Sequence, residues 1–125
     1  MEVLNQIEKQ LEQDSLLQEI SSFAERLDFL DIQILRKFYV TNKPFPNDTK
    51  PWCFPILYHE MKTKHKMKLG LEGFRKRLDN LVKLKLLVKI KHSNPVNYMP
   101  VEGKEKFVRL IITKFFLIHG ITKFF

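Results

Sequence analysis

The sequence has few of the features that mark secreted, membrane-spanning or disulfide-bonded proteins. Cys53 is its single cysteine, so no internal disulfide can form and a reducing compartment is expected. The acidic first residues lack the contiguous apolar core of a signal peptide. The apolar stretch 107–125 is interrupted by Arg109, Lys114, His119 and Lys123, which argues against a membrane span. The sequence therefore predicts a cytoplasmic protein.

Motifs for catalysis, cofactors and metals are also missing. The four histidines have no metal-ligand spacing, and one cysteine cannot supply a thiolate cluster. Neither GxxxxGK[ST] nor GxGxxG occurs. No Ser/His/Asp, Cys/His or paired-carboxylate arrangement stands in a recognised motif. We therefore expect no enzyme activity, no cofactor and no metal.

Charge is distributed very unevenly along the 125 residues. Residues 1–31 hold eight acidic side chains against two basic ones, whereas residues 62–92 hold eleven Lys and Arg against two acids. A concentrated basic stretch is the electrostatic signature of a polyanion-binding surface. A membrane-surface helix is the alternative, but the basic run spans a helix, a turn and strands rather than one helix. Nucleic acid is the favoured partner.

Residues 71–84 have the pattern of an amphipathic recognition helix. Phe74, Leu78, Leu81 and Val82 recur at three- and four-residue steps and share one face. The opposite face would carry Glu72, Lys76, Asp79, Asn80 and Lys83, with Arg75 and Arg77 at its margins. Arg suits a bidentate contact to guanine and Asn one to adenine, while Lys suits phosphate. The alternative is an ordinary solvated face.

A basic β-hairpin is expected to follow over residues 87–99. Leu86, Val88 and Ile90 alternate with Leu87, Lys89 and Lys91, as in a half-buried strand. Residues 92–95 are turn formers, and Val96 and Tyr98 would return as the second strand. Residues 52–54 could add a short third strand. For Trp52 we favour a core position over a ligand-stacking role.

Two runs in the chain resemble winged helix-turn-helix regulators of the bacterial and archaeal MarR, ArsR and Lrp type. Residues 27–35, LDFLDIQIL, are similar to the LDxxDxxIL opening of the first helix in such domains. Residues 77–89 resemble the run RLxxLxxxGLVxR that ends a recognition helix and opens the wing. Lys85 replaces the usual Gly, and a left-handed stop there would cost up to about 1 kcal/mol. The resemblance implies a mainly α fold with a small β-hairpin (α+β).

Capping residues and helix breakers predict the bounds of the other helices. The first helix of the domain is expected from Asp31, as its cap, to about Val40, and the next from Pro55 to about Lys64. Residues 2–26 form an acidic amphipathic segment, with a possible break at Asp14–Ser15 where Ser15 and Gln18 resemble a capping box. Residues 102–125 read as a helix that is apolar nearly all round.

This pattern divides the chain into an N-terminal dimerisation helix (1–26), a winged-helix domain (27–101) and a C-terminal dimerisation helix (102–125). An exposed apolar surface of this size needs a partner, and we expect a two-fold homodimer. The predicted dimer interface consists of Leu4, Ile7, Leu11, Leu17, Ile20, Phe107, Leu110, Ile111, Phe115, Leu117, Ile118 and Ile121.

Two functions follow as hypotheses. The first is a dimeric transcriptional regulator that binds double-stranded DNA, with recognition helices in major grooves about 34 Å apart. Its DNA-binding residues would be Lys62, Lys64, Lys66, Lys68, Arg75, Lys76, Arg77, Asn80, Lys83, Lys89, Lys91, His92 and Asn94. The second is a winged-helix interaction module in a transcription or replication complex, with a protein partner bound through the C-terminal helix.

Overall fold

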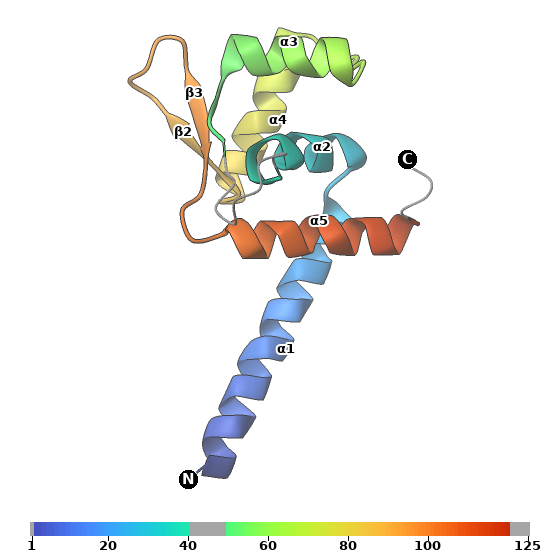
Figure 1. The fold of residues 1–125 in the computed structure, drawn as a ribbon, viewed down its shortest axis with the longest axis vertical. Helices are drawn as coiled ribbons and strands as arrows, with labels where there is room; N and C mark the ends of the chain where they lie inside the picture. The colour runs from blue at the N-terminus through green and yellow to red at the C-terminus, as the bar shows by residue number, and fades with distance from the viewer. Residues whose placement is uncertain (1, 41–49, 121–125) are drawn as a thin grey trace.

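The computed structural model describes residues 2–40 and 50–120, with side chains from residue 5 onward. Over these residues the chain is mainly helical with a small three-stranded antiparallel sheet, as predicted (Figure 1). The elements are α1 (Glu2–Arg26), α2 (Phe29–Tyr39), β1 (Trp52–Cys53), α3 (Phe54–Lys64), α4 (Leu71–Lys83), β2 (Leu87–Ile90), β3 (Asn97–Pro100) and α5 (Glu105–His119). The bounds of α3, α4 and the hairpin lie within one or two residues of their predicted positions.

The sheet has the strand order β1-β3-β2, so the two-residue strand predicted at Trp52 pairs with the return strand of the hairpin. Ser93 closes the hairpin, because its hydroxyl donates to the Ile90 carbonyl and accepts from the Asn97 N–H, both at 3.0 Å. The inward face of β2 differs from the prediction. Leu87 is 2% exposed whereas Val88 is 42% exposed, because the turn before the strand brings Leu86 and Leu87 inward together.

That turn is a left-handed helix stop at Lys85, where φ is 62°. The Leu86 N–H donates to the Leu81 carbonyl at 3.0 Å and the Lys85 N–H to the Val82 carbonyl at 2.9 Å. These are the two bonds of a Schellman motif, which satisfies the last carbonyls of α4. The stop therefore stays at the position expected from the resemblance, although a lysine occupies it.

The helix α1 is continuous, and the predicted break at Asp14–Ser15 is wrong. The segment contains neither Gly nor Pro, and Gln10 Nε2 donates to Asp14 Oδ1 across one turn at 3.1 Å. Only its second half joins the body: Ile20 and Ala24 are buried in the core, as is Leu27 directly after the helix. The first half leaves the body as an arm, with α5 lying across its base (Figure 1).

The start of α2 also differs from the prediction. Its N-cap is Asp28 rather than Asp31, and the two residues form a capping box. The Asp31 N–H donates to Asp28 Oδ1 at 2.9 Å, and the Asp28 N–H donates to Asp31 Oδ2 at 3.2 Å. Asp31 is thus the third helical residue, where a carboxylate reaches back to the cap.

Tyr39, the last residue of α2, is fully buried and joins three parts of the chain. Its hydroxyl donates to the Leu86 carbonyl at 2.6 Å and accepts from the Val101 N–H at 2.7 Å. Its own carbonyl accepts from Arg109 Nε of α5 at 2.9 Å. Burial raises the pKa of Tyr39 to about 12, so the hydroxyl keeps its proton at neutral pH.

The helix α5 covers α1 and α2 with part of its apolar surface. Val108, Ile111, Ile112, Phe115 and Phe116 are buried within the chain. The remaining apolar residues reach solvent: Leu110 is 41%, Leu117 71% and Ile118 44% exposed. One domain therefore covers more of this helix than the sequence pattern indicated, but not all of it.

Replacing Tyr39 with Phe is expected to lower the free energy of unfolding by about 1–3 kcal/mol, because the Leu86 carbonyl and the Val101 N–H lose a buried partner. Urea unfolding followed by circular dichroism measures the change. Tyr58→Phe is the matched control, since the half-buried Tyr58 ring stacks on Phe54 and should tolerate loss of its hydroxyl within about 0.5 kcal/mol. Equal effects of the two changes would refute the bridging role of Tyr39.

Replacing Lys85 with Gly is expected to raise the free energy of unfolding by about 0.5–1 kcal/mol, because Gly adopts a positive φ without steric cost. The same substitution at the exposed Lys76, in the middle of α4, should lower it by about 1 kcal/mol. The same urea titration compares them. Destabilisation by both would show that the stop at Lys85 is not left-handed.

Candidate nucleic-acid interface

One face of α4 carries a row of basic and amide side chains. Phe74, Leu78 and Leu81 are completely buried, which fixes the rotation of the helix about its axis. The opposite face therefore points outward, and the predicted Arg75, Lys76, Asn80 and Lys83 are all exposed. The Arg75 guanidinium lies 4.9 Å from the centre of the Phe54 ring, so a cation–π contact orients it at the first turn of α3.

The β2–β3 hairpin stands beside this face and adds further positive charge. Lys91, His92 and Asn94 are exposed around its turn, as predicted. Lys89 has a different surrounding: its Nζ lies 3.3 Å from Asp79 Oδ1 of α4, and its side chain is 27% exposed. The Tyr98 hydroxyl donates to the same carboxylate oxygen at 3.4 Å. Lys89 and Tyr98 thus hold the hairpin against α4.

The end of α3 and the turn after it supply the other predicted lysines. Lys64, Lys66 and Lys68 are exposed, and Lys62 is half-buried with its Nζ 5.6 Å from the centre of the Tyr58 ring. Lys64 also pairs with Glu60 at 3.0 Å. That carboxylate accepts from Lys37 of α2 at 2.9 Å as well, and the two lysines lower the pKa of Glu60 to about 2.

Arg77 does not belong to the exposed row, which corrects its predicted role in reading bases. Its guanidinium turns toward the start of α2, where Nη1 bonds Asp28 and lies 3.3 Å from Asp31 Oδ1. Asp31 is only 4% exposed, and burial together with the neighbouring Asp28 raises its pKa. Arg77 neutralises the buried Asp31 and the exposed Asp28, so it connects the two runs that resemble winged-helix families.

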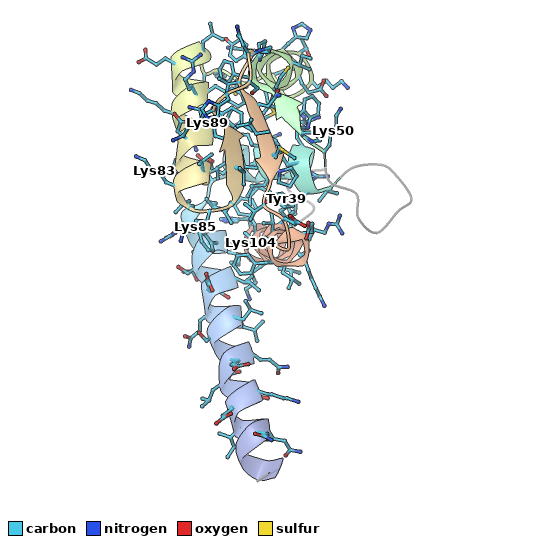
Figure 2. The ribbon with its side chains drawn as sticks, turned by 90° about the vertical axis from the view of Figure 1, so that its left-hand side faces the viewer. Tyr39, Lys50, Lys83, Lys85, Lys89 and Lys104 are labelled. Carbon is cyan, nitrogen blue, oxygen red and sulfur yellow. The ribbon has the colours of Figure 1, made fainter. Side chains whose placement is uncertain are left out.

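Sequence reasoning missed an apolar groove beside the hairpin and the lysines that surround it. The groove has a volume of about 440 Å³ and lies between the end of α4, the start of β2 and the link to α5. Lys85 and Lys104 are on its rim, and Lys104 Nζ donates to the Lys85 carbonyl at 3.1 Å (Figure 2). Residues 85 and 104 are far apart in sequence, so no local pattern could have paired them.

Several predicted dimer-interface residues are buried inside the chain itself, which corrects that assignment. Ile20, Ile111 and Phe115 are at most 4% exposed because α1 packs on α5. Phe107 is half-buried, with its ring edge-on to Phe23 at 6.0 Å. The remaining residues of the set that the structure describes, Ile7, Leu11, Leu17, Leu110, Leu117 and Ile118, are exposed. The side chain of Leu4 and the whole of Ile121 lie outside the described residues.

Replacing Arg77 with Met is expected to lower the free energy of unfolding at pH 7 by about 2–3 kcal/mol, since it leaves the buried Asp31 without its cation. Lys76→Met, the exposed neighbour, should change it by less than about 0.5 kcal/mol. Thermal and urea unfolding of the two variants supply the comparison. A neutral Arg77→Met would show that the ion pair contributes nothing to the fold.

Comparisons with protein-family models, with curated proteins and with solved structures found no match for this chain. None of the helices in the described ranges 2–40 and 50–120 is long and apolar enough to cross a membrane. Within the same ranges, no three His, Cys, Asp or Glu side chains come together as metal ligands would. The surface itself is therefore the evidence for function.

Proposed function

We propose that this protein binds double-stranded DNA as a winged-helix transcriptional regulator. The order of elements supports the proposal: a helix, a short strand, two helices and a hairpin follow one another, and β1 lies beside the last strand. In such domains the second helix of the pair enters the major groove and the hairpin lies along the backbone. Here these elements are α4 and β2–β3. The lone, half-buried Cys53 fits a cytoplasmic location.

The observation that carries this proposal is the exposed row on α4. Arg75, Lys76, Asn80 and Lys83 occupy one side of the helix, and side chains of these types bind guanine, adenine and phosphate. Acids near the row are few: Glu72 lies in the first turn, and Asp79 is neutralised by Lys89. An α-helix with such a face matches the width of the major groove.

Contacts to the phosphate backbone would come from both sides of α4. Lys64, Lys66 and Lys68 follow α3, which crosses the backbone in helix-turn-helix docking. Lys91, His92 and Asn94 lie around the turn of the hairpin. These residues would set affinity for any sequence, whereas Asn80 and Arg75 would set preference between sequences. Lys89 and Arg77 leave the predicted contact set, because both are engaged inside the domain.

A second candidate function is a winged-helix module that binds another protein. The exposed apolar residues of α5 favour it, above all Leu117 at 71% and Ile118 at 44% exposure. A surface of this kind is typical of a binding site for an apolar partner. The two functions use different faces of the molecule, so a DNA-binding titration distinguishes them.

Fluorescence anisotropy with random duplex DNA at several salt concentrations tests the proposal. We expect micromolar binding that weakens steeply with salt, because each neutralised phosphate releases counterions. Lys68→Glu should weaken binding to every sequence and reduce the slope of log K against log salt by about 1, while Asn80→Ala should mainly change sequence preference. Selection of bound sequences from a random pool measures the latter.

The control is Lys114→Glu, which makes the same charge change at an exposed position of α5. It should leave both the affinity and the salt slope close to those of the unmodified chain. The absence of DNA binding at low salt would refute the proposal. Equal weakening by Lys68→Glu and Lys114→Glu would show that binding follows net charge rather than the α4 surface, and would refute it too.

A further inference from the structure

The apolar groove has the chemistry of a site for a helix with acidic residues beside apolar ones. Its walls are Val82 of α4, Leu87 and Val88 of β2, and Val101. Four lysines surround these walls, Lys85, Lys89, Lys91 and Lys104, and of these Lys89 is already paired with Asp79. Figure 2 shows Lys83, Lys85, Lys89 and Lys104 on this side of the hairpin. Lysine stems extend an apolar surface while their ammonium groups stay at its edge in water.

An apolar floor distinguishes this groove from a phosphate-binding surface. Val88 in the groove is 42% exposed, and Val82, Leu87 and Val101 beside it are apolar as well. Apolar side chains gain free energy from leaving water, so a groove of this kind favours an aliphatic side chain over a phosphate group. The lysines at the rim then favour carboxylates on either side of that aliphatic side chain.

The arm of α1 carries the complementary chemistry. Ile7 and Leu11 are one turn apart, 50% and 62% exposed, and share a face of the helix. The arm also carries four acids, Glu8, Glu12, Asp14 and Glu19, against the single base Lys9 over residues 5–19. Every side chain over residues 5–19 is exposed. A helix standing alone in water is only marginally stable, so its apolar face requires cover.

We infer that the groove binds the α1 arm of a second copy of this chain. Ile7 and Leu11 would contact Val82, Val88 and Val101, and the arm's carboxylates would approach the surrounding lysines. The arm cannot fill the groove of its own chain, because it points away from the body (Figure 1). The arm is acidic and the groove is basic. Repulsion between like charges therefore disfavours pairing of an arm with an arm or of a groove with a groove.

The position of the groove makes this exchange reciprocal. Lys104 on its rim lies 5.9 Å from the centre of the Phe107 ring, which packs edge-on against Phe23 of α1. The groove is therefore close to the root of the arm. Residues 5–23 of a helix span about 27 Å, so each arm is long enough for its tip to reach the groove beside the root of the partner's arm. Such an arrangement has two-fold symmetry and closes as a dimer.

Sedimentation equilibrium without DNA tests the oligomeric state and the two surfaces together. The unmodified chain is expected to have twice the monomer mass. Val88→Asp in the groove and Leu11→Asp on the arm should each halve it, whereas Leu117→Asp on α5 should leave it doubled. Far-UV circular dichroism verifies that each variant keeps its helices. All three side chains are exposed, so none of the changes removes a core residue.

Chemical cross-linking identifies the contact directly. Leu11→Cys and Val88→Cys are made separately in a Cys53→Ser background, mixed, and treated with a short bismaleimide. A covalent dimer joining residues 11 and 88 should form in the mixture and not in either variant alone. A monomeric chain, or a dimer lost only in Leu117→Asp, overturns the inference. A groove occupied by an acidic helix of another protein would give a monomer here and overturns it as well.

The inference does not depend on DNA binding. Anisotropy with random DNA on Leu11→Asp separates the two, because Leu11 lies on the arm and not on α4. A variant that becomes monomeric and still binds DNA supports the groove as a self-association site. A dimer that does not bind DNA would refute the proposed function alone.

Discussion

The hydroxyl of Tyr39 fixes the parts of the molecule that carry its surfaces. It joins the turn between α4 and β2 to the link between β3 and α5 by two short hydrogen bonds. Leu86 follows Lys85, and both Lys85 and Val101 line the groove, so one buried group ties two sides of the groove together. The angle between α4 and the hairpin therefore depends on a buried side chain that belongs neither to the exposed face of α4 nor to the lining of the groove. A buried polar group with two partners specifies an arrangement that apolar packing alone leaves less defined.

Ion pairs inside the domain decide which basic residues remain for a ligand. Arg77 neutralises Asp31 beneath the first turn of α2, and Lys89 holds the hairpin to Asp79. Both were predicted as DNA contacts from their positive charge and their place on α4 or the hairpin, and both have a partner that the chain itself provides. A side chain already paired and partly buried would have to break that pair to reach a base or a phosphate. Fewer basic residues of α4 are available to a ligand than the sequence suggests, but those that remain on its outer face are exposed.

Local patterns predicted the elements well and their contacts poorly. The three- and four-residue spacing of Phe74, Leu78 and Leu81 was sufficient to define α4 and its exposed face. The same periodicity could not predict the contact of Arg77 with Asp28, 49 residues away, or that of Tyr39 with Leu86, 47 residues away. Periodicity shows which side chains share a face of a helix, but not which residues pack against that face. The face of β2 was wrong for a related reason: the left-handed stop at Lys85 changes the phase of the alternation, and propensity alone gives no signal for that change.

The opposed charges of the chain are kept apart by its shape. The acidic arm leaves the body on the side opposite α3, whose end carries the lysines proposed to contact phosphate (Figure 1). Charges separated by more than a Debye length, about 8 Å at physiological salt, hardly influence one another through water. The arm's carboxylates therefore need not oppose a polyanion on the α3–α4 side. In the proposed dimer they would approach the lysines at the rim of the second copy's groove, Lys85 and Lys104 among them. One strongly asymmetric sequence can in this way present two separate electrostatic surfaces, one that we propose for a nucleic acid and one for a copy of itself.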